Sequence, residues 1–101
     1  MGGRGSASKV SWKTQLRQMA KRGQMPGAIY GTKDVQRKII LEIDKLYPMP
    51  EVKTVKIVDQ GGSVWVNFGS SVSRGFYPSG DKADEAEKRG VLKMLLWKHK
   101  T

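Results

Sequence analysis

The chain has 101 residues and a formal net charge of +10, because 19 Lys and Arg residues face only 9 Asp and Glu residues. It contains no cysteine and a single histidine, His99, which leaves almost nothing for a disulfide, a thiolate metal site or a Ser-His-Asp centre. No apolar run approaches the ~18 residues of a membrane-spanning helix, and the N-terminus lacks the hydrophobic region of a secretory signal. We therefore expect a small soluble, cytoplasmic protein that is not an enzyme, needs no cofactor and binds a polyanion.

Positive charge is concentrated in the first 33 residues, which contain no acidic residue. The basic residues of this segment are Arg4, Lys9, Lys13, Arg17, Lys21, Arg22 and Lys33. They give it a charge of +7, whereas the other 68 residues carry 12 basic and 9 acidic side chains, a net of +3. A one-signed arm beside a balanced domain is typical of a nucleic-acid-binding protein.

The first third divides into a tail and a helix. Residues 1–8 are small and rich in glycine, and we expect a disordered basic tail. Residues 9–31 are predicted to hold a short basic amphipathic helix, from an N-cap at Ser11 to a stop at Gly23, and a linker. The apolar stripe of this helix is Trp12, Leu16 and Met19, and its neighbouring basic face is Lys13, Arg17 and Lys21.

Residues 32–101 are predicted to form a compact α+β domain that begins with a helix over 33–47. Apolar residues recur there at helical spacing, Thr32 can cap the first turn, and Pro48 ends the helix. The stripe consists of Val35, Ile39, Ile43 and Leu46.

Three strands of an antiparallel sheet follow, over 52–58, 63–69 and 70–77. The turn at 59–62 contains two glycines, as hairpin connections require. Alternation predicts Val55, Ile57, Val64, Val66, Phe68, Val72 and Phe76 on the core side. It places Trp65 on the opposite face, and Gly75 suggests a bulge that sets the direction of Arg74.

A last helix is predicted over 81–98. Its first turns are acidic and its end is basic, which complements the helix dipole. Gly90 lies inside it at a cost of ~1 kcal/mol relative to alanine, so we expect a close backbone approach to the sheet there. The predicted fold is an N-terminal basic helix followed by α-β-β-β-α, with the helices packed on the sheet.

The order helix, three strands, helix over residues 32–98 resembles the double-stranded RNA-binding domain. The most specific segment is SGDKADEAEKRGVLKMLL, where Lys82, Ala86 and Gly90 fit the family's basic and small positions. The family's lysine cluster is reduced to Lys82, and the first hairpin loop, 59–62, is short and has no histidine. The acidic residues that surround Lys82 are Asp81, Asp84 and Glu85. The resemblance therefore implies the topology more strongly than the family's grip on duplex RNA.

The opening MGGRGSAS resembles the start of small proteins encoded beside virion-assembly genes in phages of Gram-positive bacteria. This resemblance covers eight low-complexity residues and implies a phage origin, with the host cytoplasm as the location.

Trp65 admits two interpretations. Its indole can stack a base, with Lys56 and Arg74 beside it. Alternatively, it fills the space beneath the N-terminal helix, packed on Trp12 and Leu16. The second interpretation is favoured because a short amphipathic helix needs a surface to dock on.

The favoured function is binding of DNA or RNA with little sequence specificity, through the phosphates. The predicted contacts are Arg4, Lys9, Lys13, Arg17, Lys21, Arg22, Lys56, Trp65, Arg74 and Lys82. The alternative is a phage accessory or inhibitor protein that binds a host or phage protein through Trp12, Leu16 and Met19. No metal site and no membrane role is predicted, and the oligomeric state stays open.

Overall fold

The computed structural model describes residues 11–100, so the predicted tail, Arg4 and Lys9 lie outside the described residues. The α+β prediction is confirmed: two helices, three antiparallel strands and a final helix follow one another. The elements are α2 (Trp12–Lys21), α3 (Lys33–Leu46), β1 (Lys56–Gln60), β2 (Ser63–Asn67), β3 (Val72–Phe76), the 3-10 turn η1 (Gly80–Lys82) and α4 (Glu85–Lys100).

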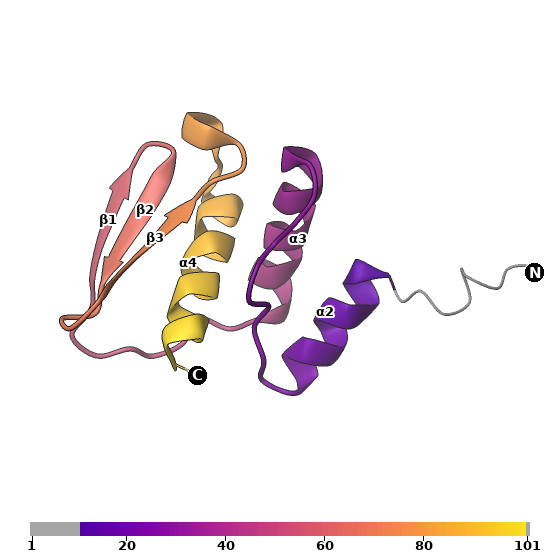
Figure 1. The fold of residues 1–101 in the computed structure, drawn as a ribbon, viewed down its shortest axis with the longest axis horizontal. Coiled ribbons are helices and arrows are strands. Elements are labelled where there is room, and N and C mark those ends of the chain that lie inside the picture. The colour runs from indigo at the N-terminus through magenta and orange to yellow at the C-terminus, as the bar shows by residue number, and fades with distance from the viewer. Residues whose placement is uncertain (1–10, 101) are drawn as a thin grey trace, which may run out of the picture.

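The elements form successive layers (Figure 1). The sheet, in the order β1-β2-β3, packs on α4, α3 lies on the other side of α4, and α2 packs on α3. One face of the sheet therefore meets the helices, and no described helix packs on the other face.

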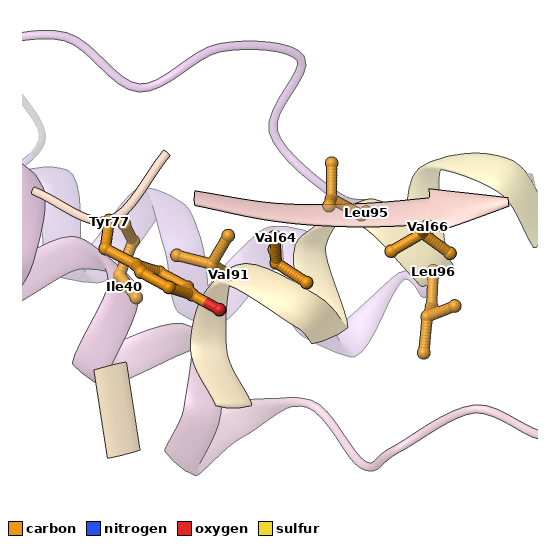
Figure 2. Close-up of a cluster of buried hydrophobic side chains, with 7 residues drawn as sticks. All are labelled: Ile40, Val64, Val66, Tyr77, Val91, Leu95 and Leu96. Carbon is orange, nitrogen blue, oxygen red and sulfur yellow. The ribbon is translucent and has the colours of Figure 1, made fainter. Parts of the chain in front are cut away.

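The main core lies between the sheet and α4. Val64 and Val66, on the helix side of β2, are 2% and 0% exposed, which confirms the alternation predicted for this strand. Figure 2 shows both valines pointing from β2 toward the side chains of α4. The buried residues of this cluster are Ile40, Val64, Val66, Tyr77, Val91, Leu95 and Leu96.

A second cluster holds α2 on the body. Leu16 is buried there with Ile43 and Tyr47 of the α3 end, and Trp97 of α4 packs against them. The Trp97 indole N–H donates to the Pro48 carbonyl at 2.8 Å, which ties the C-terminal helix to the end of α3. Leu16 and Trp12 of the predicted apolar stripe therefore dock this helix.

The prediction of which residues of the third strand face the core is wrong. Val72 and Phe76 point away from the helices and are 55% and 63% exposed, whereas Gly75 is buried on the core side. A Cβ at Gly75 would lie 2.6 Å from Cγ1 of Val91, so this glycine lets α4 approach the sheet. The β2–β3 register is one-to-one over all five pairs, and no bulge occurs.

Burial along the first strand also departs from the alternation. Ile57 pairs with Val66 on the helix side but is 46% exposed, because β1 is an edge strand that α4 covers little. Val55, just before this strand, is partly buried against the main core.

The last helix begins later than predicted, at Glu85. Residues 80–82 form η1, and Asp84 accepts the backbone N–H of Glu87 at 2.9 Å and so caps the helix. Gly90 does mark a close approach, but its neighbour is α3 rather than the sheet. A Cβ at Gly90 would lie 2.4 Å from the Ile40 carbonyl oxygen.

Replacing Gly90 with alanine should therefore destabilise the protein, although alanine is the better helix former. The added methyl would force α3 and α4 apart, and overpacking of this kind costs about 1–3 kcal/mol. Urea unfolding measures the change. Gly27→Ala is the matched control, because nothing lies within 4 Å of its Cβ position. An unchanged or raised stability of the Gly90 variant would contradict the packing described here.

Candidate nucleic-acid interface

Most acidic residues of the chain form ion pairs with basic residues of α3 and α4. Asp44 on α3 pairs with Arg89 and Lys93 on α4 at 3.0 Å each. Arg37 of α3 pairs with Asp84 and the buried Glu87 at 2.9 and 3.0 Å. Within α3, Lys38 pairs with Asp34 and Lys45 with Glu42. Lys88 of α4 pairs with Asp59 of β1. These ion pairs therefore engage six basic residues of α3 and α4.

The Asp44 pairs are partly buried, and they shift the titration of this carboxyl group. Burial alone would raise the pKa of Asp44, but the hydrogen bonds and charges of Arg89 and Lys93 outweigh it and lower the pKa. Asp44 therefore stays ionised and holds two basic residues in the interface between α3 and α4.

The exposed face of α2 carries basic residues without such partners. Lys13, Arg17 and Lys21 are exposed and recur every four residues, and no ion pair joins them to a carboxylate among residues 11–100. The helix begins where predicted, since Ser11 Oγ accepts the Thr14 N–H at 3.2 Å. These three residues therefore form a cationic row at the surface, continued by the exposed Arg22 at the helix end.

The residues predicted for a protein partner lie on the other face of α2. Trp12, Leu16 and Met19 line a cavity of about 250 Å³ between α2, the linker and α3. Leu16 is only 3% exposed, so it anchors the helix, whereas Trp12 and Met19 are partly exposed. Ile29, Tyr30 and Ile39 complete the apolar wall.

The register brings three predicted residues together on the outer face of the sheet. Trp65 pairs with Arg74, and Lys56 pairs with Asn67 on the same face. The guanidinium of Arg74 lies 4.7 Å from the Trp65 ring centroid and 4.4 Å from that of Phe76. The expectation that Trp65 lies beneath the N-terminal helix is wrong, because α2 packs on α3.

Phe76 is a residue of this face that the sequence analysis missed. The alternation along residues 70–77 predicts it on the core side together with Val72. The available signal was Tyr77, which is 5% exposed: if that residue points inward, its neighbour must point outward.

Lys82 stands apart from both groups. It is exposed on η1. This element lies beside the β1–β2 turn, since a Cβ added at Gly61 would be 2.7 Å from Oδ1 of Asp81. The predicted site residues that the structure describes are thus divided between α2, the outer sheet face and this turn. The α3–α4 layer lies between α2 and the sheet (Figure 1).

Comparisons with protein-family models, curated proteins and solved structures found no match for this chain. Within residues 11–100, no helix is both long and apolar enough to cross a membrane. In the same part of the chain, no group of three or more His, Asp or Glu side chains is arranged to hold a metal ion.

Proposed function

We propose that this protein binds nucleic acid without sequence specificity, through phosphate contacts of the basic face of α2. The supporting observation is a row of basic residues on the exposed face of α2. The cationic row of Lys13, Arg17 and Lys21 has no carboxylate partner among the described residues, whereas most acidic residues of α3 and α4 are paired. Lysine and arginine on one helix face bind phosphates irrespective of the bases.

The packing of α2 supports the same function. Because Leu16 fixes the helix on α3, the row is displayed from a docked surface and the helix need not be ordered by the ligand. The N-terminal residues Arg4 and Lys9 are proposed to add two further phosphate contacts from the chain that precedes α2.

The double variant Lys13→Gln/Arg17→Gln tests this function. Loss of two phosphate contacts should weaken binding of a short DNA duplex about 10- to 100-fold at 0.1 M salt. The reason is that the logarithm of the affinity depends linearly on the logarithm of the salt concentration, with a slope set by the number of phosphate contacts. Fluorescence anisotropy with labelled duplex DNA, duplex RNA and single strands measures it. Duplex RNA is included because of the resemblance to the double-stranded RNA-binding domain.

Lys38→Gln/Lys45→Gln is the matched control, because it removes the same charge from α3, where both lysines have carboxylate neighbours. Equal losses in the two variants would show that only the overall charge matters, and the proposed role of α2 would then be abandoned.

A protein partner is the second candidate, favoured by the apolar cavity beside α2. Trp12 and Met19 expose part of their surface there, next to Tyr30, which is 80% exposed. If the protein binds no nucleic acid at low salt, this cavity becomes the leading site.

A further inference from the structure

The outer face of the sheet has a composition that separates it from the rest of the described surface. Strand register assigns nine residues to it: Lys56, Val58, Gln60, Ser63, Trp65, Asn67, Val72, Arg74 and Phe76. Two of the nine are basic and none is acidic. Asp59, the acidic residue of β1, lies on the helix side, where it accepts from the Tyr77 hydroxyl at 3.2 Å and pairs with Lys88.

Apolar and aromatic surface is exposed on the same face. Val58, Val72 and Phe76 are 36%, 55% and 63% exposed, and they make up half of the exposed large hydrophobic residues among those described. The helices of the described chain pack elsewhere: α4 lies on the inner face and α2 on α3.

Arg74 joins the two aromatic side chains of this face. Its guanidinium is held within 5 Å of both ring centroids, and no described carboxylate pairs with it. The Trp65 indole N–H has no acceptor among the described residues, so ring stacking and packing hold this side chain. Stacking orders the guanidinium but leaves its charge available to an anion.

Charge complementarity decides among the occupants of this face. If a second copy of the chain bound here, Lys56 and Arg74 of one copy would face the same two residues of the other. This is unfavourable because the face has no acidic residue to offset the repulsion. A duplex hides the faces of its bases. A single strand offers both unstacked bases for the aromatic rings and phosphates for the two basic residues.

We propose that the outer face of the sheet binds single-stranded nucleic acid, with a base stacked on Phe76 beside the Trp65–Arg74 pair and phosphates on Lys56 and Arg74. The proposal rests on the proposed function for the class of ligand, but it uses a surface on the far side of the α3–α4 layer from α2. The protein would then hold phosphates at α2 and unpaired bases at the sheet.

Phe76→Ala in the full chain tests this inference, with Val72→Ala as the matched control because both residues are exposed on β3. Loss of one stacked base should weaken binding of an oligothymidylate about 5- to 100-fold. Binding of duplex DNA of equal length should not change. The salt dependence should also stay as in the wild type, whereas Arg74→Gln should reduce its log–log slope by about 1.

Equal oligothymidylate affinities of the Phe76 and Val72 variants would overturn the proposal. A dimer in sedimentation that Phe76→Ala dissociates would also overturn it, since the face would then be covered by a second copy. Failure here is distinguishable from failure of the proposed function, because Lys13→Gln/Arg17→Gln changes duplex binding and Phe76→Ala does not.

Discussion

Replacing Glu87 with alanine is expected to lower the free energy of unfolding by about 3 kcal/mol, because two hydrogen bonds to a buried carboxylate are lost and bonds to a charged group contribute about 1.5–3 kcal/mol each. Glu87 is fully buried, and its carboxylate accepts the backbone N–H and the hydroxyl of Ser79 at 2.8 and 2.7 Å. It also pairs with Arg37 Nε at 3.0 Å. The alanine variant leaves the two Ser79 donors without an acceptor in a partly buried site, which adds to the loss.

Urea unfolding followed by tryptophan fluorescence measures this loss. Glu85→Ala is the control, because Glu85 is exposed in the same turn of α4, and its replacement should change stability by no more than about 0.5 kcal/mol. Similar stabilities of the two variants would mean that the carboxylate of Glu87 does not connect α4 to the Ser79 turn.

Replacing Asp44 with alanine is expected to cost a similar amount, about 3 kcal/mol, because it leaves the ammonium of Lys93 in a nearly buried position without its carboxylate. The side chains of Asp44 and Lys93 are each 11% exposed, and their atoms are 3.0 Å apart. Lys93 keeps the backbone carbonyl of Asp44 as a partner at 2.8 Å, which limits the loss.

The double variant Asp44→Ala/Lys93→Met supplies the control for the Asp44 prediction. Removal of both charges should recover much of the stability that the single variant loses, since apolar residues can replace a buried pair at little cost. If the double variant is no more stable than Asp44→Ala, the loss arises from packing and not from the unpaired ammonium.

The Asp44 contribution should also depend on pH. Because the folded protein lowers the pKa of Asp44 below its ordinary value of about 3.9, the contribution is complete above roughly pH 5. It is lost as the pH falls through the folded pKa. The difference in stability between wild type and Asp44→Ala should therefore shrink below about pH 4. A difference that stays constant down to pH 2 would contradict the ion pairs.

The elements with a clear period could be predicted from the sequence. The stripe of α3 and the alternation of β2 each determine a buried face, because both helices and strands repeat regularly. The faces of β3 could not be predicted, because the core position of this strand is occupied by Gly75, which has no side chain. The large apolar residue next to it, Phe76, therefore looks like the core residue. A pattern of apolar residues also cannot identify a glycine that is buried because a helix packs closely against it, as α4 does against Gly75.

The candidate sites could be predicted in part. The basic row of α2 follows from spacing alone, and Lys56, Trp65 and Arg74 share a face as the alternation suggests. The surface that receives α2 could not be predicted, because Leu16 and its neighbours indicate an apolar stripe without its partner. The burial of Glu87 could not be predicted either, because acidic residues in the first turn of a helix are commonly explained by the helix dipole.

The salt dependence of duplex DNA binding by the full chain tests the central claim most directly. If six basic residues of the first 22 each contact a phosphate, the log–log slope of affinity against salt should lie near −5 to −6. The six are Arg4, Lys9, Lys13, Arg17, Lys21 and Arg22. Lys13→Gln/Arg17→Gln should reduce the magnitude of the slope by about 2. Affinity that does not change between low and moderate salt would contradict the account.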